Sequence, residues 1–209
     1  FCELMINDTG ELDVLGSWLV GEHYFKDQLK DVLMVQREIQ NPFFTDNPWT
    51  RALEGKKVLV IHPFAPLIEQ QYELNREKLF ENKSVLPEFE LKTIQAVQSM
   101  GGKHPKYKSW FEALQNMMNQ MDYTEYDIAL IGCGSYGFPL SAHAKRTGKK
   151  AVHLGGSLQL LFGIKGKRWE DPNYNRLYNY SALMNEYWVR PDENLRPKNA
   201  ESVEGACYW

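Results

Sequence analysis

The stretch 128–168 constrains the fold more than any other part of the chain. A short apolar run at its start meets a glycine turn, Gly132-Cys-Gly134-Ser-Tyr-Gly137. An amphipathic stretch follows, and a second strand-like run then leads into Gly155-Gly156. This order of strand, glycine turn, helix and strand is the pattern of a βαβ unit, with glycines where a backbone approaches a phosphate.

Directly beyond this unit, glycines alternate with cations in Gly163-Ile-Lys165-Gly166-Lys167-Arg168. Glycine lets such a loop fold tightly, while Arg offers a planar fork that suits phosphate or carboxylate and Lys offers a point charge. Two glycine-rich loops and a basic cluster predict an anionic, nucleotide-like ligand. The residues expected to bind it are Gly132, Gly134, Ser135, Tyr136, Gly155, Gly156, Lys165, Lys167 and Arg168.

The glycine spacing also fits a nicotinamide or flavin dinucleotide, and an NAD(P)-type oxidoreductase is the first alternative. A unit of that kind carries Asp or Glu about 20 residues on, at the end of the second strand, where the carboxylate binds the ribose. His153 holds that position here. A second alternative is that the glycines only allow close packing of helix on strand and that the cations are solvated.

Composition excludes several classes of protein. With 209 residues, 43% of them hydrophobic, the chain is long enough for one folded domain. A net charge of -3 gives no reason to expect a nucleic-acid partner. The 3 cysteines are odd in number and far apart, which argues against a disulfide framework and a structural zinc site. No apolar run approaches the roughly 18 residues of a transmembrane segment, and we expect a cytoplasmic protein.

Strand-like and helix-like runs alternate along most of the chain. Residues 1–50 predict a helical segment, 55–170 a Rossmann-like core, and 171–209 a segment that wraps the surface. Because residue 1 is Phe rather than Met, the native chain is expected to extend N-terminal of it. The predicted fold class is α/β, a single Rossmann-like domain with a mainly parallel sheet flanked by helices.

His62 is the first candidate catalytic residue. It ends an apolar run that reads as a buried parallel strand and precedes Pro63. Ligands of an open parallel sheet bind at the carboxyl ends of the strands, where the strand order reverses, so His62 is expected beside the glycine turns. An imidazole there can donate to a phosphate or act in acid-base catalysis, and the alternative is a histidine satisfied by its own strand end.

Carboxylates gather around a glycine near the amino end, in Asp8-Thr-Gly-Glu11-Leu-Asp13. Such a group suits a hard cation that bridges a diphosphate. The alternative is a helix cap at Asp8 or Thr9 with Glu11 in the first turn. Glu11 and Asp13 are the candidates for a catalytic base or for ligands of Mn²⁺ or Mg²⁺.

Three stretches, 55–64, 126–137 and 149–169, carry a resemblance to a known family. They resemble bacterial proteins of uncharacterised activity that are found among polysaccharide-biosynthesis genes. The close resemblance spans about residues 10 to 209. More distantly, the strand-glycine-helix-strand region is similar to glycosyltransferases of the D-type fold, a Rossmann-like class of transferases.

This resemblance implies a glycosyltransferase that uses a nucleotide-activated sugar in cell-surface glycan or polysaccharide synthesis, with a nucleotide-sugar donor and a glycan acceptor as partners. The similar transferases carry an early Asp-x-Glu pair that handles metal and nucleotide sugar. Here Glu11 fits that pattern, whereas Asp8 lies one residue too far away. A non-catalytic partner in a polysaccharide-synthesis assembly remains a further alternative.

Overall fold

The computed structural model describes residues 1–98, 106–197, 200–202 and 204–209. Short 3₁₀ turns connect its longer elements. The strands are β1 (Val14–Ser17), β2 (Leu33–Gln36), β3 (Lys57–His62), β4 (Glu90–Gln95), β5 (Ile128–Ile131) and β6 (Lys150–His153). The helices are α1 (Cys2–Asp8), α2 (Ala65–Leu79), α3 (Trp110–Asp122), α4 (Gly137–Arg146), α5 (Leu158–Leu161) and α6 (Lys167–Glu170).

The main sheet has four parallel strands in the order β4-β3-β5-β6. From β3 the chain passes through α2 to β4, returns across β3 through α3 to β5, and continues through α4 to β6. The strand order therefore reverses between β3 and β5, the position at which open α/β sheets bind ligands beyond their strand ends. Those two strands end at His62 and Ile131.

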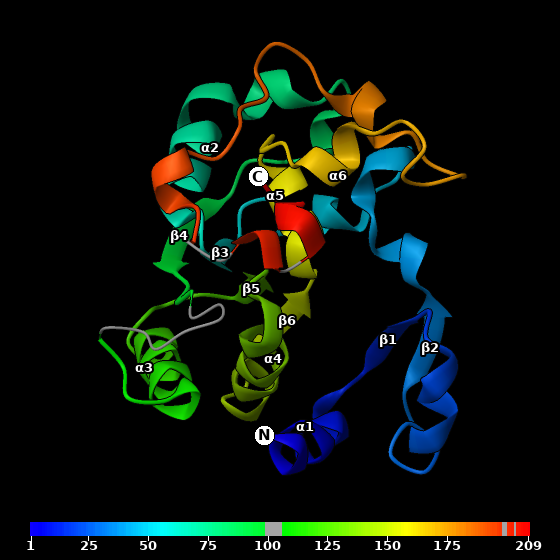
Figure 1. The fold of residues 1–209 in the computed structure, drawn as a ribbon, viewed down its shortest axis with the longest axis vertical. Coiled ribbons are helices and arrows are strands. Elements are labelled where there is room, and N and C mark those ends of the chain that lie inside the picture. Colours follow the sequence, from blue (N-terminus) through cyan, green and yellow to red (C-terminus); the bar gives the residue numbers. More distant parts are fainter. Residues whose placement is uncertain (99–105, 198–199, 203) are drawn as a thin grey trace.

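Successive side chains of the central strands point to opposite faces of the sheet and form two cores. Val58 and Val60 of β3 pack in the core with Ile68 of α2 and with the segment around α5. On the other face, Leu59 and Ile61 pack with the apolar sides of α3 and α4. Helices thus cover both faces, with α2 and α5 on one side and α3 and α4 on the other (Figure 1). Burial on both faces explains why the four central residues of β3, 58–61, are all apolar.

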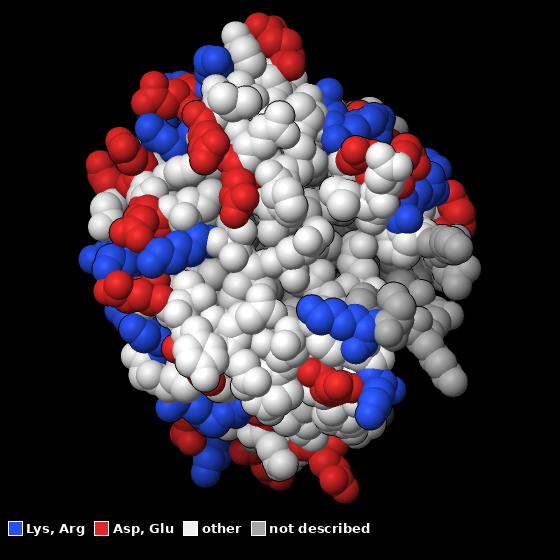
Figure 2. Space-filling view, turned by 90° about the vertical axis from the view of Figure 1, so that its left-hand side faces the viewer, with Lys and Arg blue, Asp and Glu red and all other residues white. Residues whose placement is uncertain are grey.

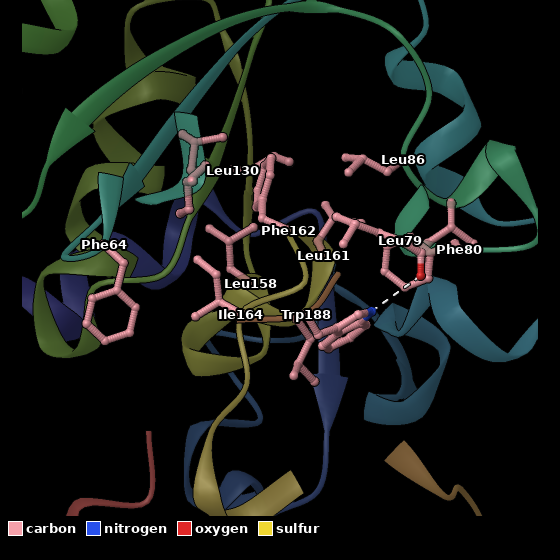
Figure 3. Packing of buried hydrophobic residues seen from close by; sticks show 14 of the residues in the cluster. Phe64, Leu79, Phe80, Leu86, Leu130, Leu158, Leu161, Phe162, Ile164 and Trp188 are labelled. Carbon is pink, nitrogen blue, oxygen red and sulfur yellow. Dashed lines mark hydrogen bonds between the residues drawn. The ribbon is translucent and has the colours of Figure 1, made fainter. Parts of the chain in front are cut away.

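The carboxyl-terminal part of the chain contributes to the first of these cores. Figure 3 shows Trp188 beside Leu79 and Phe80, with the indole Nε1 donating to the carbonyl oxygen of Leu79 at 3.3 Å. Tyr180 and Trp188 are buried, so the segment 171–209 packs into the domain as well as wrapping its surface. Residues 198, 199 and 203 of that segment lie outside the described residues.

The fold class predicted from the sequence is confirmed. The chain forms an α/β structure with parallel sheets flanked by helices. The expected strands before His62 and before the glycine turn correspond to β3 and β5, and the expected helix after that turn is α4. The strand expected before Gly155-Gly156 is β6.

The helical prediction for residues 1–50 is wrong for most of that segment. Only α1 is an α-helix there, and β1 and β2 pair in parallel as a separate two-stranded sheet (Figure 1). Leu19 and Leu33 are exposed, so the leucines of this segment do not form one buried helix face. Gly10, Gly16 and Gly21 interrupt the stretch, and glycine inside a helix costs about 1 kcal/mol relative to Ala.

Charges of both signs share the surface over α2, β4 and α3. Figure 2 shows Lys and Arg interspersed with Asp and Glu around a central area without charged side chains. Neither sign dominates that face. Within the described parts of the chain, no helix combines the length and the apolar character needed to cross a bilayer.

Candidate functional site

The two glycine turns and His62 meet at the carboxyl ends of β3 and β5. Gly132 directly follows β5, and a Cβ atom on it would lie 2.5 Å from the carbonyl oxygen of Gly155 and 2.9 Å from Cδ2 of His62. Only glycine allows this approach, because real Cβ atoms do not come so close to backbone oxygen. The convergence predicted for these three positions is therefore present at the point where the strand order reverses.

Part of this junction is open to a ligand. Gly134 and Gly155 have φ values of +59° and +58°, and a Cβ on either would have no other atom within 4 Å. Gly134 and Ser135 are exposed and begin the 3₁₀ turn Gly134–Tyr136, which runs directly into α4. The first N–H groups of a helix lack partners within it and attract anions, so this turn presents donors to the solvent.

Trp110, which the sequence analysis missed, supports the first glycine turn. Its Nε1 donates to Oγ of Ser135 at 3.1 Å, and its ring stacks on Tyr136 at 4.9 Å between centroids and 7° between planes. Tyr136 is buried and its ring belongs to the packing of the turn. Because Ser135 Oγ accepts from the indole, its own hydroxyl proton remains available for a further acceptor.

His62 is a buried, neutral imidazole. It is 3% exposed, and burial lowers its pKa from 6.5 to about 3. The backbone N–H of Phe64 donates to its Nδ1 at 3.0 Å, which leaves the ring proton on Nε2. In this state His62 is a hydrogen-bond donor rather than a ready general base.

His153 occupies the position at which a dinucleotide-binding unit has its ribose carboxylate. The residue ends β6, and its ring fills the space that a side chain on Gly137 would need. Burial lowers its pKa from 6.5 to about 4, so it too is neutral near pH 7. Glycine is required at position 137 because the His153 ring packs closely against the start of α4.

The last residues of the chain lie between the basic loop and the second glycine turn. The ring of Tyr208 fills the space over Gly156. The guanidinium of Arg168 lies 4.7 Å from the centre of the same ring and donates to Sγ of Cys207 at 2.5 Å. Arg168 therefore orders Tyr208 and Cys207, and it is not placed directly over the first glycine turn.

The two lysines of this loop differ in their surroundings. Lys165 is partly buried, and its backbone N–H donates to the carbonyl oxygen of Val189 at 2.8 Å. Lys167 is exposed and begins α6, with its backbone N–H donating to the carbonyl oxygen of Trp209 at 3.3 Å. The carboxyl-terminal segment Cys207–Trp209 thus lies between the basic loop and the second glycine turn, which the sequence did not predict.

Glu11 and Asp13, the predicted catalytic carboxylates, lie at the opposite end of α4. Asp13 pairs with Lys145 at 2.9 Å, and Glu11 lies 3.8 Å from Arg146. Both cations are in the last turn of a helix of 10 residues. A helix of that length is about 15 Å long, so these carboxylates are not brought to the glycine turns.

The same carboxylates do not fit a divalent cation. Asp8, which is 2% exposed, pairs with Arg146 at 2.7 Å, so a guanidinium already occupies the centre of the group. Among the described residues, no cluster of three or more His, Cys, Asp or Glu side chains is arranged to hold a metal ion. We therefore derive no chemical step through Mn²⁺ or Mg²⁺.

The chain was compared with known proteins at three levels. No family model, no curated protein and no solved structure matches it.

Proposed function

We propose that the protein transfers a glycosyl group from a nucleotide-activated sugar to a glycan acceptor. The observation that supports this most strongly is the junction of the two glycine turns with His62 at the strand-order reversal, next to the amino end of α4. A nucleoside diphosphate has the charge and size to use both turns at once.

The chemistry to be supported is a substitution at the anomeric carbon of the donor sugar. The bond from that carbon to the diphosphate oxygen breaks, a bond to the acceptor hydroxyl oxygen forms, and the hydroxyl loses its proton. Negative charge develops on the departing diphosphate. Backbone N–H groups at Gly134 and Ser135, together with the dipole of α4, are suited to stabilise that charge as it develops.

His62 is suited to bind the diphosphate as a hydrogen-bond donor. A neutral imidazole with its proton on Nε2 donates one hydrogen bond and keeps that state throughout the physiological pH range. We assign it the role of a donor to a diphosphate oxygen. Glu11 and Asp13 have no catalytic part here, because α4 separates them from the glycine turns.

The alternative of an NAD(P)-dependent oxidoreductase has one observation in its favour, the Gly-x-Gly-x-x-Gly spacing after β5. Two others weigh against it. His153 stands at the ribose-binding position as a packed imidazole, and the same ring occupies the space beside Gly137. We therefore rank the oxidoreductase second.

A ligand panel with the purified chain tests the proposal. Uridine diphosphate, uridine-diphosphate sugars and NAD⁺ are added separately while thermal unfolding is followed. We expect a nucleoside diphosphate or its sugar to stabilise the fold, by about 2.7 kcal/mol at 100 times its dissociation constant. Release of nucleoside diphosphate in the presence of a glycan acceptor then tests transfer.

Two results would overturn the proposal. Stabilisation by NAD⁺ alone would favour the oxidoreductase. No response to any nucleotide over a range of bases would favour the non-catalytic partner in a polysaccharide-synthesis assembly.

A further inference from the structure

A cavity of about 330 Å³ is lined in part by Trp209, whose ring also contacts Phe64. We call it the C-terminal cavity. Its walls come from the start of α6, from the segment 190–196 and from the carboxyl-terminal residues. The side chains that matter for its chemistry are Lys167, Arg190, Glu193, Arg196, Glu201 and Trp209.

Most charged side chains of this lining are paired with one another or with a neighbour. Arg196 is neutralised by Glu193, at 3.4 Å, and by Glu201. Arg190 pairs through Nη2 with Glu170 at 2.6 Å, which leaves its other N–H groups for a further acceptor. Lys167 forms no ion pair with any residue that the structure describes. Lys167 is therefore the cation of this lining that has no opposite charge among the described residues, and an anionic group beside it would pair with it.

The rest of the lining favours a sugar over a simple ion. Trp209 offers an aromatic surface, held by an edge-to-face contact with Phe64 at 5.4 Å. Glu193 and Glu201 are acceptors suited to hydroxyl groups, and the arginines are donors. A volume of about 330 Å³ is at the lower end of the range for small-molecule sites, which fits one sugar ring and exceeds what a bare phosphate needs.

The backbone of the cavity wall is strained. Ala206 has a φ of +55°, in the left-handed region that residues other than glycine rarely adopt, and it follows Gly205 with a φ of +63°. Such a conformation costs on the order of 1–3 kcal/mol and occurs preferentially at ligand-binding positions. Both residues line the C-terminal cavity.

The cavity is connected to the proposed donor site by direct contacts. Trp209 packs on Phe64, whose backbone N–H donates to His62. The backbone N–H of Lys167 donates to the carbonyl oxygen of Trp209. A ligand in the cavity would thus lie one aromatic ring away from the residues that follow β3.

We infer that the C-terminal cavity binds one sugar ring that carries a carboxylate, as the acidic unit of the acceptor glycan. The carboxylate lies against Lys167 and Arg190, and the ring lies against Trp209. This assignment as an acceptor subsite rests on the proposed glycosyl transfer, whereas binding of the acidic sugar itself does not.

Calorimetric titration of the intact chain with D-glucuronate, D-glucose and inorganic phosphate, each alone, tests the inference. We expect glucuronate to bind at least about tenfold more tightly than either of the other two. Lys167→Ala should weaken glucuronate binding about tenfold or more, as the loss of one charge-assisted contact implies. Lys108→Ala, which removes an exposed lysine outside the cavity, is the matched control and should leave binding unchanged.

Equal binding of glucuronate and phosphate would overturn the inference, since it would mean a non-selective anion site. Equal affinity of the Lys167→Ala variant and the unaltered chain would overturn it as well. If Lys167→Ala fails to fold, Arg190→Ala serves as the second variant, and it too should weaken glucuronate binding. Titration with uridine diphosphate is done on the same samples. If the unaltered chain binds uridine diphosphate but not glucuronate, the cavity assignment alone is wrong.

Discussion

The two ends of α4 carry different kinds of polar groups. Backbone N–H groups are exposed at the amino end, whereas charged side chains are paired at the carboxyl end. At the amino end, Gly134 and Ser135 are exposed in the turn that leads into α4, where N–H groups lack partners within the helix. At the carboxyl end, Lys145 and Arg146 complement the helix dipole and are neutralised by carboxylates from the amino-terminal segment. We therefore expect the paired residues at the carboxyl end to stabilise the fold and those at the amino end to bind the proposed ligand.

The largest effect we expect is a loss of unfolding free energy at low pH, caused by the two buried histidines near the amino end of α4. The pKa values of His62 and His153 lie below those of the unfolded chain, at about 3 and about 4. The unfolded state therefore binds these protons first, so stability is full above about pH 6.5 and falls with decreasing pH. Near pH 5 the unfolded chain holds both protons and the folded chain holds almost neither, so each histidine should cost about 1.4 kcal/mol per pH unit there.

Urea unfolding at a series of pH values measures this slope. His153→Gln removes one titrating group and should make the slope shallower by about one proton. His143→Gln is the control, because His143 lies on α4 and pairs with Asp122 at the surface. An unchanged slope in His153→Gln would mean that this histidine is not held neutral in the folded state.

The next largest effect is expected at the carboxyl end. Asp8→Ala removes a buried carboxylate from the half-exposed Arg146 and should cost about 2 kcal/mol of unfolding free energy. Asp13→Ala removes an exposed partner of Lys145 and should cost less than about 1 kcal/mol. Neither substitution should change the affinity for uridine diphosphate. A tenfold loss of that affinity in either variant would contradict the structural assignment of this end.

A smaller effect, on binding rather than on folding, is expected from glycine substitutions at the two ends. Asn tolerates the left-handed conformation of Gly134 better than branched residues do, and it places a side chain in the open space above the turn. Gly134→Asn should weaken nucleotide binding about tenfold or more. Gly148→Asn alters the glycine after the other end of α4, which has a φ of +78° and equally open space, and calorimetry should show no loss. Equal losses in both variants would remove the distinction between the ends.

Local patterns in the sequence predicted the amino end of α4 well. The strands before His62 and Gly132 can be recognised as continuous apolar runs, because strands of a parallel sheet are buried on both faces. Glycine is required where Gly132 approaches Gly155, and the spacing revealed the turn. Parallel strands bring their carboxyl ends to one edge, which is why separate motifs could be placed together.

Contacts between distant segments were not predictable in this way. Trp110 lies 25 residues from Ser135, and nothing in its spacing marks it as a partner. The same holds for Tyr208 over Gly156. The pairing of Lys145 with Asp13 is a further example, because it joins segments whose separation in sequence is 132 residues. Side-chain partners set by tertiary packing leave no periodic signal in a single sequence.

The most direct test is to map nucleotide binding onto the backbone amides by NMR. Uridine diphosphate is titrated into ¹⁵N-labelled protein, and the amide resonances at both ends of α4 are followed. We expect those of Gly134, Ser135 and Gly155 to shift progressively while those of Glu11 and Asp13 stay in place. Shifts concentrated at Glu11 and Asp13, with none at the glycine turns, would contradict the assignment of the ligand site to the amino end.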